Sequence, residues 1–275
     1  MRAPVGVCYR PGDMAAGKTS SVPAVDRAFD ILDLIARSQK GLSLPELVEQ
    51  SGLPKSSVHA LLLTLLRRGY LHRHGRSNRF MFGLKLFSLA NMALSGVQLR
   101  EQAAPFLQGL VEKTGLTAHM AILEHQEGVI VAKCEPPGIF RLATWIGKRM
   151  DVHCTSLGKA LLAYLDDGEV EKIIKEHGLP RHNDNTLCSR KKLKDELART
   201  RKRGYAIDDE EDEVGLRCIG APVFGADGRP AAAISLSGST HQINGANLAQ
   251  ISKLLLETVK FLSESLLLSS PPPQP

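Results

Sequence analysis

Residues 43–70 read SLPELVEQSGLPKSSVHALLLTLLRRGY, and this stretch decides the fold of the first part of the chain. Ser43 and Glu46 have the spacing of a capping box with a proline in the first turn, which predicts the start of a short helix. That helix stops at Ser51 and Gly52, and the next one begins near Lys55. Two helices joined by a tight turn that contains glycine form the pattern of a helix-turn-helix.

The helix that begins near Lys55 carries one apolar stripe at helical spacing, which consists of Val58, Leu61, Leu62, Leu65 and Leu66. An earlier stripe between residues 25 and 35 predicts a helix before this pair. Residues 70–73 and 79–82 predict two strands around a polar turn. We therefore expect a winged helix-turn-helix over residues 22–83.

Positive charge is concentrated in the same stretch. From Pro54 to Gly83 there is no acidic residue, whereas the net charge of the whole chain is +6. The basic residues of the stretch are Lys55, Arg67, Arg68, Arg73, Arg76 and Arg79. A charge run by itself is compatible with a solvated face, but its position on the third helix and the hairpin favours phosphate binding.

Roles in DNA binding follow from side-chain chemistry. Ser56, Ser57 and His59 lie at the start of the third helix, where hydrogen bonds to base edges or phosphates are available. Lys55 suits a phosphate at the helix N-terminus. Arg76 and Arg79 on the wing suit phosphates or the minor groove. The predicted partner is double-stranded DNA.

The rest of the chain predicts a second domain. Residues 84–96 are nearly uncharged, and we expect residues 84–98 to form a linker helix that also packs against another subunit. Residues 99–268 mix strands and helices without a regular βαβ repeat, which indicates an α+β domain. One of its strands is expected at residues 140–146. The ends, 1–21 and 269–275, are expected to be disordered tails.

Composition narrows the cellular setting. The chain has 275 residues, of which 43% are apolar, enough for two cores. Its five cysteines are odd in number and have no Cys-x-x-Cys spacing, which favours a reducing cytoplasm over a disulfide framework. No run approaches the roughly 18 apolar residues of a membrane span. We therefore expect a cytoplasmic protein with no membrane partner.

Several motifs resemble those of the IclR family of bacterial transcriptional regulators. Residues 22–28 read VPAVDRA and residues 52–59 read GLPKSSVH, and both match the family's N-terminal pattern. More specific is the signature from Gly204 through Asp208 and Glu211 to Cys218, although Gly225 stands where the family usually has Asp or Asn. Residues 153–160 (HCTSLGKA) and 233–238 (AISLSG) match as well. The resemblance covers roughly residues 22–268.

The resemblance implies an effector domain of the GAF-like type, dimers that often pair into tetramers, and palindromic operators. We accordingly expect a homodimer or a dimer of dimers that acts as a repressor. The family's effector-binding positions map onto Leu142, Ser156, Leu157, Asp208, Cys218, Ser235 and Ser237. At positions 156 and 157 the chain has larger residues than the glycine and alanine of the relative that binds a very small oxo-acid.

The residues themselves also indicate a pocket for a small organic acid. Ser235 and Ser237 alternate in an apolar run and so share one face of a strand, which a half-solvated strand would also explain. Ser156 precedes a helix whose N–H groups suit a carboxylate. Leu142 and Leu157 would form an apolar wall. The acidic run 208–213 is expected to be mostly a solvated loop.

Other functions are disfavoured by spacing. A thiol enzyme would use Cys154 or Cys218, but a base must lie within hydrogen-bond reach, and His153 next to Cys154 would point to the opposite face of a strand. A metal site formed by His119, His125, His153 and Cys154 lacks tight ligand spacing, so neither a metal nor a cofactor is expected. A DNA-architectural protein without an effector stays open as an alternative.

Overall fold

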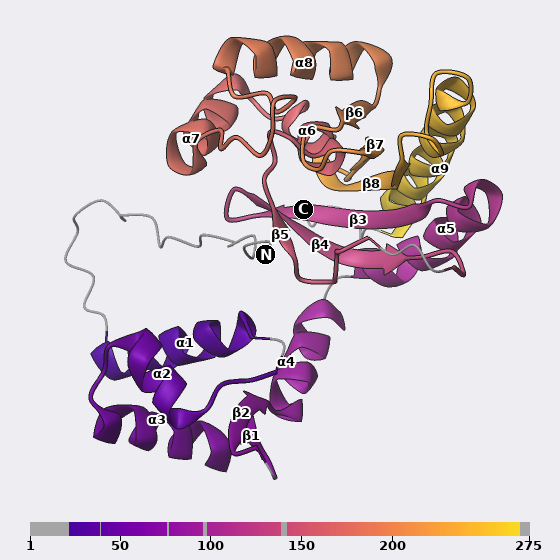
Figure 1. The fold of residues 1–275 in the computed structure, drawn as a ribbon. Coiled ribbons are helices and arrows are strands. Elements are labelled where there is room, and N and C mark those ends of the chain that lie inside the picture. The colour runs from indigo at the N-terminus through magenta and orange to yellow at the C-terminus, as the bar shows by residue number, and fades with distance from the viewer. Residues whose placement is uncertain (1–21, 39, 76, 96–97, 139–141, 270–275) are drawn as a thin grey trace, which may run out of the picture. The chain divides into compact units, whose positions relative to one another are not determined.

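The computed structural model describes residues 22–38, 40–75, 77–95, 98–138 and 142–269. It divides into two compact units, residues 1–96 and 97–275, each of which is described here by itself (Figure 1). The tails expected at 1–21 and 269–275 lie outside the described residues, except for Ser269, which ends the last helix. No described helix has the length and apolar character needed to cross a bilayer.

The N-terminal unit is a winged helix-turn-helix, as expected. Its elements are α1 (Pro23–Ala36), α2 (Leu44–Ser51), α3 (Lys55–Arg67), β1 (Leu71–His74), β2 (Arg79–Phe82) and α4 (Leu84–Ser95). The predicted capping box starts α2, because the backbone N–H of Ser43 donates to the Glu46 carboxylate over 2.7 Å. Gly52 then ends α2 in the left-handed region, at φ 66°, which lets the chain turn tightly into α3.

The core of this unit lies between its helices and the hairpin. It consists of Ile31, Ile35, Leu42, Leu47, Val58, Leu62, Leu65, Leu71 and Phe80. The stripe predicted on α3 therefore faces inward. Strands β1 and β2 pair antiparallel. Leu42, just before α2, forms an isolated antiparallel β-bridge with Phe80 of β2, on the other side of that strand.

The C-terminal unit is built on one antiparallel sheet of six strands in the order β5-β4-β3-β8-β7-β6. Its strands are β3 (Thr117–Glu124), β4 (Glu127–Cys134), β5 (Arg149–Met150), β6 (Ala206–Asp209), β7 (Leu216–Phe224) and β8 (Pro230–Ser239). Its helices are α5 (Gln98–Thr114), α6 (Ser156–Leu162), α7 (Asp167–His177), α8 (Arg190–Arg203) and α9 (Leu248–Ser269). The mixture of helices with an antiparallel sheet confirms the α+β class.

The prediction of a strand at residues 140–146 is wrong. Residues 142–146 contain no strand, and the short edge strand β5 comes only at Arg149 and Met150. The Lys133 ammonium explains the difference, because it donates to the carbonyl oxygens of Leu142 (3.1 Å) and Thr144 (2.8 Å). Two carbonyls of this segment are thus directed to a side chain instead of to a neighbouring strand.

The two faces of the sheet are covered differently. Helices α5 and α9 pack on one face over a continuous apolar core that includes Met120, Ile219 and Leu236. Helix α6 lies on the other face, and α7 and α8 pack around it (Figure 1). Gly220 on β7 permits this close approach, since a Cβ there would lie 2.6 Å from the backbone oxygen of Ser156. The face under α6 carries Ser235 and Ser237.

Candidate functional site

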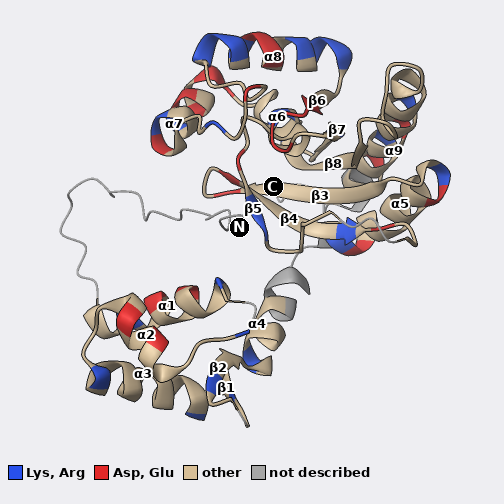
Figure 2. Ribbon diagram, in the orientation of Figure 1, with Lys and Arg blue, Asp and Glu red and all other residues tan. Residues whose placement is uncertain are grey.

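Helix α3 presents a polar surface that its own unit does not cover. Lys55, Ser56 and His59 are exposed, whereas Ser57 is half-buried, so three of the four predicted contacts on this helix are freely accessible. Figure 2 shows Lys and Arg at both ends of α3, while the acidic residues in the described part of this unit lie on α1 and α2. The sequence between Pro54 and Gly83 contains no Asp or Glu. This surface is therefore suited to a polyanion.

Exposed Leu63 lies on the same helix. It is 52% exposed and belongs to no core cluster of the unit. An apolar side chain on a face with Lys55 and His59 suits contact with a thymine methyl group in the major groove. The sequence shows Leu63 off the buried stripe but gives it no role.

The wing arginines differ in their surroundings. Arg79, a predicted DNA contact, instead donates to the Gly41 carbonyl (2.7 Å) and to the Glu46 carboxylate (2.8 Å). The Arg79 guanidinium thus joins β2 to the start of α2, which disfavours the predicted contact with DNA. Arg73 on β1 is exposed, 5.8 Å from the Phe80 ring centre, and replaces it as the candidate wing cation. Arg76 lies outside the described residues.

The C-terminal unit contains a cavity on the α6 side of the sheet. Its volume is about 80 Å³, and since one water needs roughly 10–15 Å³ of such space, it holds a molecule of only a few non-hydrogen atoms. The lining comprises His119, Ile130, Leu142, Ala143, Thr144, Lys148, Met150, Thr155, Leu157, Asp208, Asp212, Glu213, Leu216, Cys218, Ser235 and Ser237. Six of the seven predicted effector contacts are among them.

Strand register explains why residues far apart in sequence meet here. Asp208, Cys218, Ser237 and Thr117 lie opposite one another across four neighbouring strands. Because side chains alternate along a strand, Ser235 and its partner His119 share this face. Ser235 and Ser237 share one face of β8, as predicted, and both line the floor of the cavity.

Ser156 is the predicted contact that does not line the cavity. It is the first residue of α6, and its backbone oxygen lies against Gly220. The N-cap is Thr155 instead, whose hydroxyl accepts from the Gly158 N–H over 3.2 Å. Thr155 lines the cavity in place of Ser156. The helix begins at Ser156 as the sequence predicts, but its N-cap is Thr155 and not Ser156.

His119 and Lys148 are lining residues that sequence reasoning did not assign to the cavity. The His119 ring nitrogen Nε2 lies 2.8 Å from Thr144 Oγ1, and burial lowers the pKa of His119 to about 3, so the imidazole is neutral. Lys148 is half-buried at the edge of the cavity and donates to the Ala143 carbonyl over 3.1 Å. A cation at the mouth and hydroxyls on the floor suit a small anion.

Asp208 brings a carboxyl group into the same cavity. Burial raises the pKa of Asp208 to about 7, although the nearby Lys159 ammonium and the backbone N–H of Glu211 oppose this rise. The Glu211 N–H donates to Asp208 Oδ1 over 2.9 Å. Near neutral pH the group is available as a protonated donor, so it does not repel an anion as a fixed charge would.

The acidic run 208–213 is mostly solvated, as expected, but Asp208 and Glu211 are buried. Glu211 is buried and forms an ion pair with Lys159 of α6, which is fully buried as well. The Lys159 ammonium also donates to the Ile207 carbonyl. Because an unpaired charge of either sign would be costly here, this pair fixes the loop against α6, directly behind the cavity.

Neither predicted thiol nucleophile has the surroundings of one. Burial raises the pKa of Cys218, and burial together with the Asp212 and Asp151 carboxylates raises the pKa of Cys154. A thiol nucleophile needs the opposite shift. The histidines that the sequence offered as metal ligands have other partners: His119 bonds to Thr144 in the cavity, whereas His153 bonds to the Pro180 carbonyl over 3.0 Å.

A winged helix-turn-helix with a basic face, and a second unit with a small polar cavity, define a DNA-binding transcriptional regulator with an effector-binding domain. Comparison with known families agrees. Residues 24–75 match the IclR helix-turn-helix domain, and residues 91–264 match the bacterial transcriptional regulator IclR C-terminal domain. The chain belongs to the IclR family of bacterial transcriptional regulators.

Individual relatives match over nearly their whole length. The HTH-type transcriptional regulator XynR of Escherichia coli K-12 is 34% identical over 245 residues, 89% of this chain and 97% of its own. The transcriptional repressor IclR of the same strain is 33% identical over 253 residues, 91% of this chain and 92% of its own. The crystal structure of Thermotoga maritima IclR superposes with a TM-score of 0.76 at 29% identity, covering 89% and 99% of the two chains.

Proposed function

We propose that this chain is a repressor that binds operator DNA through α3 and the wing, and that a small organic acid in the C-terminal cavity modulates this binding. The observation that carries the proposal is the cavity itself, which combines Ser235 and Ser237 on its floor with Lys148 at its mouth. Repression is supported by the relative whose name states that activity, the E. coli repressor at 33% identity.

The class of effector follows from the size and lining of the cavity. About 80 Å³ admits a short-chain acid more readily than a large aromatic one. Hydroxyl groups of Ser235 and Ser237 would donate to the acid's oxygens, and Leu142 and Leu157 would contact its carbon chain. Protonated Asp208 would donate a further hydrogen bond. Binding changes operator affinity only as far as the acid prefers one conformation over the other.

A thermal-shift screen of short carboxylic acids identifies the effector, and variants locate it. Ser235→Ala and Ser237→Ala should each weaken acid binding by roughly 0.5–1.5 kcal/mol, or about two- to tenfold. Ser239→Ala is a matched control, because Ser239 lies on the same strand but its hydroxyl bonds to Gln242, away from the cavity. If no acid raises the melting temperature, the alternative of an effector-independent DNA-binding protein gains support.

DNA binding is tested with the intergenic region upstream of the gene. The logarithm of affinity should fall linearly with the logarithm of salt concentration, with a slope of about −0.9 for each phosphate neutralised. His59→Ala should alter sequence preference, whereas Lys55→Ala should weaken binding to all sequences alike. Affinity that is independent of salt would contradict the assignment of the basic face.

We also propose that the chain acts as a dimer or a dimer of dimers, through α4. Leu84 is 83% exposed and Phe87 65% exposed on this helix, and Leu89 is exposed as well. An uncovered apolar surface of this kind is typical of a subunit contact. A dimer would present two copies of α3 to two half-sites of an operator, as helix-turn-helix proteins do.

A further inference from the structure

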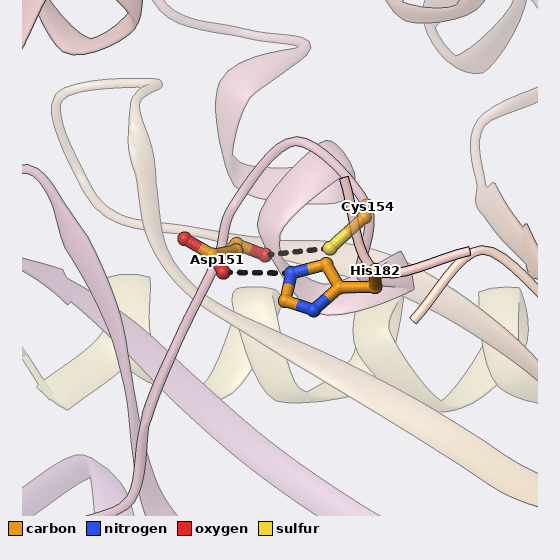
Figure 3. A group of neighbouring side chains, drawn as sticks. All are labelled: Asp151, Cys154 and His182. Atoms are coloured by element: carbon orange, nitrogen blue, oxygen red, sulfur yellow. Dashed lines mark hydrogen bonds and ion pairs between the residues drawn. The ribbon is translucent and has the colours of Figure 1, made fainter. Parts of the chain in front are cut away.

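Asp151, Cys154 and His182 bring three different metal-binding side chains together outside the effector cavity. Figure 3 shows the three around one small volume, with the carboxylate of Asp151 facing the His182 ring. The distance between Asp151 Oδ2 and His182 Nε2 is 2.9 Å, and one ligand atom from each residue lies within 4.8 Å of the other two. Cys154 is buried beneath them, whereas His182 is exposed.

Hydrogen bonds hold both contributing segments in place. Thr155 Oγ1 donates to the Asp151 carbonyl over 2.8 Å and caps α6, which fixes the turn that carries Cys154. On the other segment, Thr186 Oγ1 accepts from the His182 N–H over 3.2 Å and donates to the Glu211 carbonyl over 2.8 Å. Ligands on segments fixed in this way need little rearrangement to bind an ion.

The surroundings of the three side chains favour a cation. Asp212 Oδ1 lies 3.9 Å from Cys154 Sγ, which adds a second carboxylate beside the thiol. His153 stacks on His182 with ring centres 6.3 Å apart, while its own Nε2 bonds to the Pro180 carbonyl, so it orients His182 without competing as a ligand. The nearby Lys159 charge is already matched by Glu211.

We propose that Asp151, Cys154 and His182 form a zinc site. A thiolate, an imidazole and a carboxylate are a donor set that suits zinc, and solvent would complete the tetrahedron. Zinc bonds of about 2.0–2.3 Å place neighbouring ligand atoms roughly 3–4 Å apart. The three ligand atoms here lie within 4.8 Å of one another, so they need to move together only slightly to bind the ion. The sequence does not reveal this set, because His182 lies 28 residues beyond Cys154.

A bound zinc ion would link the start of α6 to the segment that carries His182. Thr155 and Asp212, which adjoin the ligands, also line the effector cavity. Zinc would therefore rigidify one wall of the cavity without occupying it. This role is additional to the proposed effector response, because the ion is bound by residues that are not in the cavity lining, and either can fail without the other.

Zinc and cobalt binding to the full-length protein test the proposal. Zinc is titrated against a chromophoric chelator, and cobalt substitution is followed in the near ultraviolet, where a bound thiolate gives a charge-transfer band. We expect one equivalent of zinc, a thiolate band, and a raised melting temperature. Cys154→Ser should remove the band, and Cys154→Ser and His182→Gln should each weaken zinc binding at least tenfold.

Matched variants separate this site from general metal binding. Cys134→Ser changes a half-buried cysteine on β4, and His241→Gln changes an exposed histidine after β8; both should bind zinc like the unaltered protein. His182 is at the surface, so His182→Gln remains informative if Cys154→Ser does not fold. A stoichiometry far below one, or equal zinc affinity in His182→Gln and His241→Gln, would overturn the zinc site.

Discussion

At the scale of single residues, Asp208 has the most unusual chemistry in the described part of the molecule. It lies in the floor of the cavity opposite Cys218, with Lys159, Glu211 and Asp212 around it. Burial raises its pKa from 3.8 to about 7 and outweighs the Lys159 ammonium. The group thus titrates close to neutrality, where most carboxyl groups are fully ionised.

Asp208→Asn should therefore change how stability depends on pH. Between pH 3.8 and about 7 the folded chain holds a proton on Asp208 that the unfolded chain has lost, so this stabilisation disappears as pH rises through 7. The asparagine variant should gain stability relative to the unaltered protein between pH 5.5 and 8.5, on the order of a few kcal/mol at most. Urea unfolding followed by the single tryptophan, Trp145, reports on this unit.

The control for this prediction is Asp195→Asn, at an exposed position on α8. Asp208→Asn keeps an oxygen that can accept from the Glu211 N–H. A difference in stability between the two proteins therefore does not come from the loss of this hydrogen bond. Identical pH profiles for Asp208→Asn and Asp195→Asn would contradict a raised pKa at Asp208.

At the scale of elements, the wing shows how two similar arginines take different roles. Arg79 of β2 is joined to Glu46 and Gly41, and Ser43 and Arg79 together lower the pKa of Glu46 to about 2, with the Ser43 N–H as the largest cause. Arg73 of β1 is exposed. One arginine joins the hairpin to α2, and the other is available to DNA.

Arg73→Ala and Arg79→Ala should separate these roles. Arg73→Ala should reduce the salt dependence of DNA binding by about 0.9 in slope and leave the domain's stability unchanged. Arg79→Ala should speed amide hydrogen exchange in α2 and β2, because both its bonds cross between these elements, and should leave the salt slope unchanged. If Arg79→Ala also reduced the dependence of DNA affinity on salt concentration, Arg79 would be a DNA contact after all.

Individual helices and strands also show which features could be predicted from the sequence. The capping box set the start of α2 correctly because its hydrogen bonds are local, and alternation placed Ser235 and Ser237 on one face. The strand expected at 140–146 failed because Lys133 binds the carbonyls of that segment. Glu211 was assigned to solvent because its partner, Lys159, lies 52 residues away. Periodicity shows which residues share one face of a helix or strand, but it does not show which distant side chain contacts them.

The cavity shows the same limit. The family resemblance named residues that line the cavity, apart from Ser156. The sequence did not identify His119, which strand register places there, or Thr155, which is the N-cap of α6 in place of Ser156. It did not identify Lys148 either. The cluster of Asp151, Cys154 and His182 forms only when a loop after α7 returns to the start of α6.

At the scale of the whole molecule, the helix-turn-helix and the proposed effector cavity belong to separate units. The basic stretch from Pro54 to Gly83 lies in the first unit, and the cavity lies in the second. Operator recognition by two half-sites requires two copies of the first unit, which α4 is proposed to join. A dimer would therefore bind an operator more tightly than a single chain, because it would present two copies of α3.

Phe87→Glu should dissociate the assembly. A charge at a side chain that is 65% exposed costs little in the single chain but is unfavourable in an apolar contact between chains. We expect a monomer by light scattering at micromolar concentration and a loss of operator affinity. Val214→Glu, at an equally exposed position in the second unit, is the control. A Phe87→Glu protein with unchanged mass in solution would place the subunit contact elsewhere.

The loop 208–213 has a consequence for how this protein can acquire a new specificity. Asp208 and Asp212 line the cavity, while Glu211 neutralises Lys159 and its carbonyl accepts from Asn183 and Thr186. Mutations in this loop therefore alter recognition and folding together, and selection would remove most of them. On the opposite wall, Leu142 belongs to none of the apolar core clusters of the described residues, and Leu157 packs only against other apolar side chains, such as Ala160 and Leu161. A laboratory library that randomises this wall should yield folded regulators with altered effector choice far more often than one that randomises the loop.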